Sequence, residues 1–113
     1  MKFIHKYKSP NFNQRVKGAK INYIIIHYTA MTSSEEAISH LCSKKNKVSA
    51  HFLINKQGNI YNLVNLQNRA WHAGKAFWKK ELDINSYSIG IEIDNSGELL
   101  KNEKYTSLQI SSL

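Results

Sequence analysis

Five side chains in this 113-residue sequence have chemistry that a catalytic or metal site could use: His27, His51, His72, Glu92 and Asp94. A catalytic zinc ion takes three protein ligands from His, Asp, Glu or Cys and keeps a further position open for water. The local spacings contain no zinc signature, since neither His-Glu-x-x-His nor Cys-x-x-Cys occurs. Spacing alone therefore gives little support for a metal site.

The residues themselves leave both structural and functional interpretations open. His51 alternates with Leu53 along an expected strand, which favours a structural histidine. His72 follows Trp71 in "AWHAG", which suits either a surface pair or the wall of a cleft that stacks on sugar or peptide. Glu92 lies on the small-residue face of an apolar strand, which is unusual for a carboxylate, whereas Asp94 is interpreted as a turn residue.

The elements that must position these side chains can be predicted from periodicity. Three consecutive isoleucines in "NYIIIHYTA" predict a strand buried on both faces, with His27 near its carboxyl end. In open α/β sheets, ligands bind outside such strand ends. "SYSIGIEID" alternates isoleucine with Ser88, Gly90 and Glu92, and these small residues leave space above their face for a substrate or another backbone.

Further elements complete an α/β pattern. Ser33 and Glu36 form a capping box before a helix, and Cys42 ends its apolar stripe as a small core residue. "FLINKQGNIYNLV" predicts a hairpin around a glycine-containing turn. Residues 68–85 predict a long loop with room for a helical turn, and loops of this length in a compact domain are usually functional. Residues 102–113 begin a helix without completing it.

Composition indicates one globular domain, with a net charge of +8 that suits an anionic partner. We expect residues 1–20 to form an irregular N-terminal arm and residues 21–113 to form the domain. No basic helix or nucleic-acid module is evident, so nucleic-acid binding rests on charge alone. The single cysteine excludes an internal disulfide, and the sequence shows no signal peptide or membrane-spanning segment. We expect a soluble, cytoplasmic protein.

Five segments occur together in order: "SPNFNQR", "INYIIIHYTA", "VSAHFLINKQGNIYNLV", "RAWHAGKAFW" and "INSYSIGIEIDNSG". In this respect the chain resembles the zinc-dependent N-acetylmuramoyl-L-alanine amidase family of bacteria, in its AmpD-like branch. The resemblance covers roughly residues 9–113 and implies an α/β fold with a mixed central β-sheet flanked by helices, as in peptidoglycan recognition proteins. It also implies hydrolysis of the amide that joins N-acetylmuramic acid to L-alanine in peptidoglycan or muropeptides.

The resemblance assigns roles residue by residue. It makes His27 a zinc ligand at the end of the central strand and Glu92 the catalytic acid/base, while Arg69, Trp71 and His72 line the substrate groove. Related branches carry a tyrosine where this chain has Ala50, so a tyrosine-assisted mechanism is not available there.

The family takes its other two zinc ligands, a histidine and an aspartate or cysteine, from a segment after the glutamate strand that residues 1–113 do not include. We therefore expect the domain to be incomplete at its C-terminus, through truncation or degeneration. The alternative function is a non-catalytic peptidoglycan-binding module.

Overall fold

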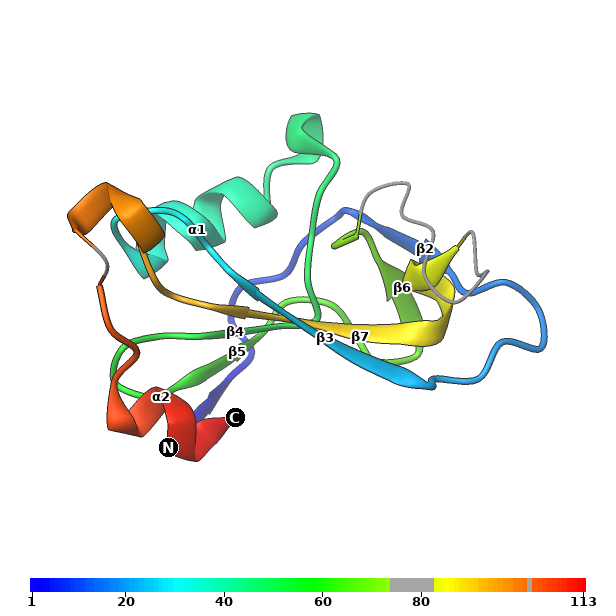
Figure 1. Ribbon diagram of the computed structural model, residues 1–113. Coiled ribbons are helices and arrows are strands. Elements are labelled where there is room, and N and C mark those ends of the chain that lie inside the picture. Colours follow the sequence, from blue (N-terminus) through cyan, green and yellow to red (C-terminus); the bar gives the residue numbers. More distant parts are fainter. Residues whose placement is uncertain (74–82, 102) are drawn as a thin grey trace.

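The computed structural model describes residues 1–73, 83–101 and 103–113. A five-stranded sheet in the order β1-β5-β4-β7-β3 forms the centre of the molecule (Figure 1). Strand β7 pairs in parallel with both β3 and β4, whereas β4 and β5 are antiparallel. The sheet is therefore mixed, as predicted. Its strands are β1 (Phe3–Ile4), β3 (Tyr23–Tyr28), β4 (Phe52–Ile54), β5 (Ile60–Asn62) and β7 (Ser88–Ile93).

Helix α1 (Ser34–Leu41) covers one face of this sheet, and the short helix α2 (Ser107–Ser112) lies on the other (Figure 1). The Ser33 hydroxyl accepts a hydrogen bond from the Glu36 amide at 3.1 Å, so the predicted N-cap is confirmed. The Glu36 carboxylate, however, accepts from the Thr32 hydroxyl and does not close a reciprocal box. Among the described residues there are also three 3₁₀ helices: Lys44–Asn46, Ile84–Tyr87 and Gly97–Leu100.

The main core lies between α1 and the β4–β5 hairpin. Its buried members are apolar side chains from the helix, from β4 and from the residue after β5: Ala37, Ile38, Leu41, Leu53 and Leu63. Cys42 is partly buried against this cluster, which confirms its predicted place beside the core. Burying this stripe fixes α1 above the sheet, and the helix then forms one wall of the site described below.

Residues 1–20 are not the irregular arm that we expected. Strand β1 extends the sheet in parallel with β5, and β2 (Phe12–Gln14) pairs with β6 (Asn68–Ala70) in a second, two-stranded antiparallel sheet. Both strands are too short to show a periodic pattern in the sequence. The predicted irregular conformation is therefore wrong for these segments. The predicted loop over residues 68–85 begins with strand β6, which was not expected, and ends in a 3₁₀ helix, where the prediction allowed a helical turn. Residues 74–82 lie outside the described part of the chain.

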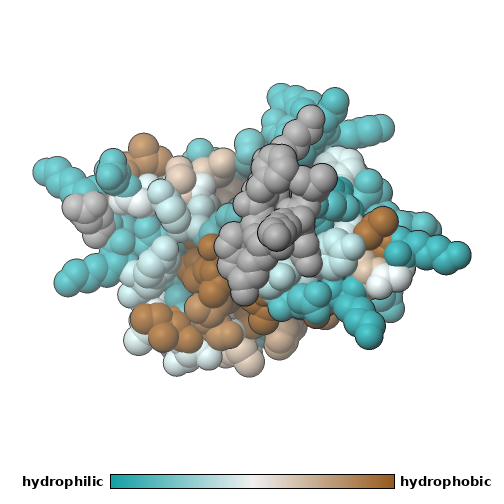
Figure 2. Space-filling model, turned by 45° about the vertical axis from the view of Figure 1, so that its right-hand side comes forward, coloured by the Kyte–Doolittle hydropathy of each residue, from teal (hydrophilic) through white to brown (hydrophobic). Residues whose placement is uncertain are grey.

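Strand β3 is neither central nor buried on both faces. It occupies an edge of the five-stranded sheet, and Ile24 and Ile26 are 63% and 50% exposed. Apolar side chains gather in the lower part of the face in Figure 2. Isoleucine runs fit a strand buried on both faces, but the described residues cover only the His27 face of β3. Among those residues, the structure contains no helix with the length and hydropathy needed to cross a membrane.

Candidate active site

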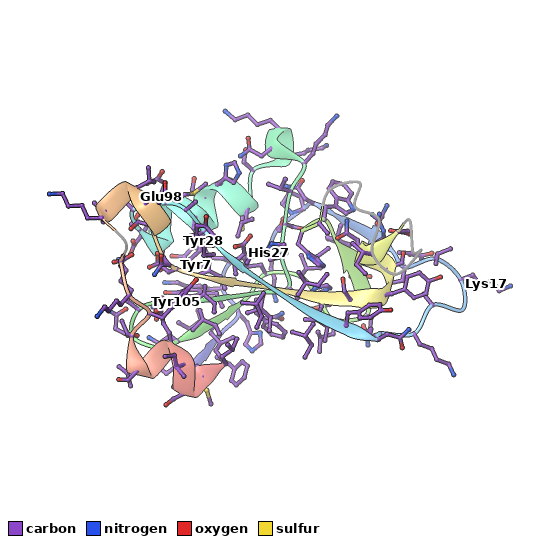
Figure 3. The ribbon with its side chains drawn as sticks, viewed as in Figure 1. Tyr7, Lys17, His27, Tyr28, Glu98 and Tyr105 are labelled. Atoms are coloured by element: carbon purple, nitrogen blue, oxygen red, sulfur yellow. The ribbon has the colours of Figure 1, made fainter. Side chains whose placement is uncertain are left out.

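His27 and Glu92 come together because their strands pair in parallel. They are direct register partners in the β3–β7 ladder, so their side chains emerge on the same face of the sheet. Figure 3 shows His27 on β3, one residue before Tyr28. Six residues of β3 pair with β7, which makes this the longest ladder of the described sheet. The two side chains that the family resemblance singles out thus lie on the most extensively paired part of the scaffold.

A cleft of about 170 Å³ opens beside Glu92. One wall comes from α1 and its flanking segments, and the other comes from the residues that follow β6. The lining residues are Thr29, Met31, Ala37, His40, Leu41, Val48, Ser49, Trp71, His72 and Glu92. Apolar side chains near a single carboxylate and two histidines are typical of a small-ligand site. Sequence reasoning did not identify the α1 residues as lining, because their helical spacing indicates only a core-facing stripe.

The Glu92 carboxylate is poorly solvated. Its Oε2 atom is buried and accepts no hydrogen bond from any described residue. Burial disfavours the charged form and raises the pKa of Glu92 from its ordinary 4.5 to about 7. A carboxyl group that titrates near neutral pH can both accept and return a proton, which is the property required of a general acid/base.

His72 packs inside the site, above Gly90. Its Nδ1 lies 3.1 Å from His27 Nε2, and its Nε2 lies 2.9 Å from the Ser88 hydroxyl. Burial, followed by the nearby His27 and His51 rings, lowers the pKa of His72 to about 3, and burial also lowers the pKa of His27. Both rings are therefore neutral near pH 7. The space above Gly90, which we expected a substrate or backbone to occupy, is filled by the His72 ring.

His51 has the structural role that its strand position predicted. It is fully buried, its Nδ1 accepts a hydrogen bond from the Gly90 amide, and its Nε2 donates to the Asn68 carbonyl. Burial lowers the pKa of His51, which keeps this ring neutral as well. His51 thus ties β7 to Asn68, the first residue of β6.

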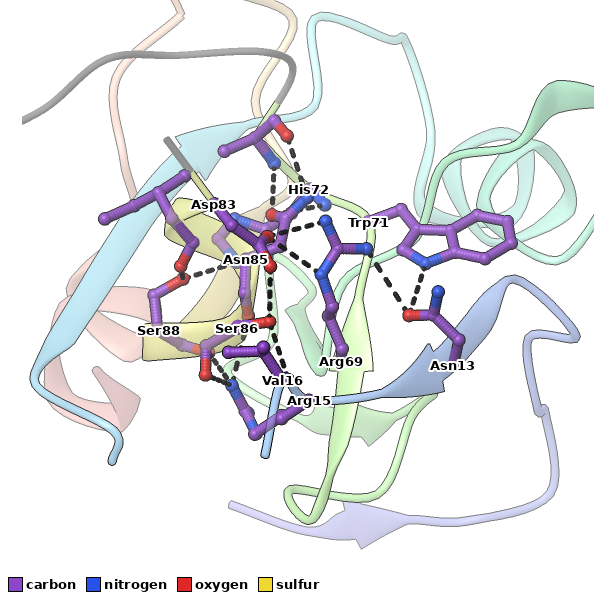
Figure 4. Close-up of polar contacts among 12 residues, drawn as sticks. Asn13, Arg15, Val16, Arg69, Trp71, His72, Asp83, Asn85, Ser86 and Ser88 are labelled. Carbon is purple, nitrogen blue, oxygen red and sulfur yellow. Dashed lines mark hydrogen bonds and ion pairs between the residues drawn. The ribbon is translucent and has the colours of Figure 1, made fainter. Parts of the chain in front are cut away.

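Trp71 borders the cleft, but Arg69 does not. The Trp71 indole donates a hydrogen bond to Asn13 Oδ1, which also accepts from the Arg69 guanidinium (Figure 4). Arg69 forms its ion pair with Asp83, at 2.7 Å between Nη2 and Oδ1. The short strand β2 therefore holds the aromatic wall through Asn13, which lies in the "SPNFNQR" segment but was given no role from the sequence.

Asp94 is not simply a turn residue. It is 3% exposed, and its Oδ2 accepts a 2.6 Å hydrogen bond from the hydroxyl of Ser34, the first residue of α1. A carboxylate beside the first turn of a helix stabilises that end of the helix electrostatically. The turn interpretation failed because the pairing joins residues sixty positions apart.

The donor atoms provide a direct test of the expected zinc site. A neutral imidazole suits zinc, and His27 is neutral here, so it fits as one ligand. Among the described residues, no group of three His, Cys, Asp or Glu side chains could hold a metal ion. His27 therefore needs partners from outside these residues to form a complete site.

Curated relatives of this chain are bacterial amidases. It is 29% identical to the 1,6-anhydro-N-acetylmuramyl-L-alanine amidase AmpD of Haemophilus influenzae over 90% of this chain and 65% of that protein. It is 36% identical to the N-acetylmuramoyl-L-alanine amidase AmiD of Escherichia coli over 69% of this chain and 30% of that protein. The chain thus spans between about a third and two thirds of the length of these relatives.

Solved structures share the fold. A selenomethionine AmpD derivative superposes with a TM-score of 0.82 at 23% identity, covering 98% of this chain and 69% of that one. AmiD from E. coli, solved with anhydro-N-acetylmuramic acid-L-Ala-D-γ-Glu-L-Lys, gives a TM-score of 0.72 at 29% identity, covering 88% of this chain and 43% of that one. The family model "N-acetylmuramoyl-L-alanine amidase" matches residues 17–113. This chain therefore belongs to the N-acetylmuramoyl-L-alanine amidase family.

Proposed function

We propose that this chain forms the catalytic cleft of an enzyme that hydrolyses the amide between N-acetylmuramic acid and L-alanine. The observation that carries the proposal is Glu92, a partly buried carboxyl group with a pKa of about 7 that lines the cleft. AmpD and AmiD, the relatives matched above, are named as amidases of this type. The substrate is then peptidoglycan or a muropeptide released from it.

In this proposal Glu92 performs the proton transfers. Its ionised form accepts a proton from the attacking water, and its protonated form then gives that proton to the departing alanine nitrogen. The group must change its charge in each cycle, and a pKa near the working pH makes both forms accessible. General acid/base catalysis of this kind contributes about 10²- to 10⁴-fold in rate.

Zinc enters the proposal through His27. The family resemblance makes this residue one ligand and draws the other two from a segment beyond residue 113. When bound, zinc polarises an amide carbonyl and lowers the pKa of a bound water to about 7. What the described residues contribute is a neutral imidazole and an adjacent carboxyl group on register-paired strands.

We propose that Trp71 and the apolar residues of α1 contact the substrate, because they line the cleft. His72 also borders the cleft, although its ring nitrogens bond to His27 and Ser88. The expected substrate contact of Arg69 stays a prediction, since its guanidinium is engaged with Asp83. The absence of a nucleic-acid partner and the cytoplasmic location also stay predictions.

The test uses the chain extended by the family segment that carries the other two zinc ligands. Hydrolysis of anhydro-N-acetylmuramic acid-L-Ala-D-γ-Glu-L-Lys in the presence of zinc is followed by chromatography of the released tripeptide. We expect Glu92→Gln to reduce the rate of release about 10²- to 10⁴-fold. Glu98→Gln serves as the matched control, because Glu98 is exposed and does not line the cleft. Equal rates for the parent and the Glu92 variant would contradict the assigned role.

One observation favours the alternative of a non-catalytic peptidoglycan-binding module: the described residues retain the cleft but do not bring three metal donors together. Such a module would bind the muropeptide without releasing the tripeptide. Calorimetric titration of the muropeptide, combined with the release assay, separates the two functions. Parallel assays on intact cell wall and on the soluble muropeptide distinguish the two substrates.

A further inference from the structure

A continuous row of hydrogen-bonded groups leads from the 3₁₀ helix at Ile84–Tyr87 to the ring of His27. The Ser88 hydroxyl lies 2.8 Å from the Ile84 carbonyl oxygen and 2.9 Å from His72 Nε2. His72 Nδ1 in turn lies 3.1 Å from His27 Nε2. Figure 4 shows Ser88 and His72, the part of this row nearest the 3₁₀ helix.

The direction of each hydrogen bond in this row follows from its first member. The Ile84 carbonyl has no proton to give, so the Ser88 hydroxyl must donate its single proton there. The Ser88 oxygen can then only accept from His72, which places the His72 proton on Nε2. In the tautomer that carries its one proton on Nε2, His72 accepts at Nδ1, and His27 Nε2 then donates.

We propose that Ser88 and His72 are positioning residues that hold His27 with its proton on Nε2 and its Nδ1 lone pair free. His27 and Glu92 are register partners on one face of the sheet, so the imidazole lies on the same side of the sheet as the carboxyl group. A neutral imidazole with one free ring nitrogen is the form in which histidine binds a metal ion. Outer hydrogen bonds of this kind fix the tautomer and orientation of a ligand histidine. This role in the reaction rests on the proposed function.

The local sequence provides the space and support that this row needs. Gly90 has no Cβ, and a Cβ built there would lie 2.3 Å from His72 Cγ. The Asn85 side chain holds the backbone beside the ring, because its Oδ1 accepts from the amides of His72 and Ala73. Alternate residues of β7 thus supply a hydroxyl, room for the imidazole and a carboxyl group.

The experiment is long-range ¹H–¹⁵N NMR of the ¹⁵N-labelled chain at pH 8, which reports where each imidazole carries its proton. We expect His27 and His72 each to occupy a single tautomer, protonated at Nε2. A His27 ring protonated at Nδ1, or at both nitrogens, would overturn the proposal. The measurement does not involve hydrolysis, so an inactive chain can still show the predicted tautomers and an active chain can fail to show them.

Ser88→Ala tests the origin of the row. Removing the hydroxyl takes away the group that accepts the His72 proton. The population of His27 protonated at Nδ1 should then increase about fivefold, which is the ratio that corresponds to one hydrogen bond of about 1 kcal/mol. Ser86→Ala is the matched control, since Ser86 is an equally buried serine that bonds to Asp83 and Val16 outside the row. Equal tautomer ratios in the two variants would overturn the proposal. If Ser88→Ala does not fold, the parent spectrum alone decides.

Discussion

Glu92→Gln should stabilise the protein at pH 8, although we expect the same substitution to reduce hydrolysis. Burial raises the pKa of Glu92 from 4.5 to about 7, so the folded protein binds this proton more tightly than the unfolded chain does. Below pH 4.5 Glu92 is protonated in both the folded and the unfolded chain, so its ionisation does not lower the free energy of unfolding. Between pH 4.5 and 7 the free energy of unfolding falls as pH rises. Above pH 7 the whole loss of stability that comes from ionising Glu92 is present.

The size of this effect follows from the difference between the two pKa values. A difference of about 2.5 pK units corresponds to about 3 kcal/mol, at about 1.36 kcal/mol per unit. This value is an upper bound, because Glu92 borders the cleft and keeps some contact with water. Glutamine has nearly the same shape and no charge, so it removes the pH-dependent term and leaves the packing in place.

The assay is urea denaturation of the parent, Glu92→Gln and Glu98→Gln at pH 4 and pH 8. We expect Glu92→Gln to raise the free energy of unfolding by about 1–3 kcal/mol at pH 8 and to leave it nearly unchanged at pH 4. The exposed control should match the parent within about 0.5 kcal/mol at both pH values. The argument from burial would be refuted if Glu92→Gln did not raise the free energy of unfolding at pH 8, or raised it equally at pH 4 and pH 8.

Three other substitutions or treatments test separate parts of the structure. Gly90→Ala should lower the free energy of unfolding by about 1–3 kcal/mol in the same assay, because its methyl group overlaps the His72 ring; an unchanged midpoint would show that the ring can move aside. The purified 113-residue chain should lose its zinc on brief dialysis against a chelator, since His27 is not part of any three-donor group among the described residues; tightly held stoichiometric zinc would contradict this. Ile110→Ser should reduce fluorescence of the dye ANS, because Ile110 is 65% exposed beside an apolar cleft; undiminished fluorescence would place the dye elsewhere.

Local pattern predicted the elements whose stabilising contacts are close in sequence. The N-cap of α1 at Ser33, the β4–β5 hairpin and the alternating strand β7 all follow from spacing within a few residues. Strands β1 and β2 could not be predicted in this way, because they are two and three residues long and pair with residues more than fifty positions away.

The same distinction applies to the site. The register that pairs His27 with Glu92 depends on the order of strands, which periodicity does not give. The sequence indicated a carboxylate on a small-residue face, but the ring that fills the space above Gly90 comes from His72, eighteen residues earlier. Asp94 likewise resembled a turn residue until the fold placed it beside Ser34.

The central claim is that this cleft hydrolyses the bond between the sugar acid and L-alanine, and the most direct measurement locates the oxygen that comes from water. The reaction is run in H₂¹⁸O on anhydro-N-acetylmuramic acid-L-Ala-D-γ-Glu-L-Lys, and both products are analysed by mass spectrometry. Attack at the muramyl carbonyl places one ¹⁸O in the carboxyl group of the released sugar acid and none in the tripeptide. Label in a carboxyl group of the tripeptide would mean that a different amide is cleaved, and would contradict the account.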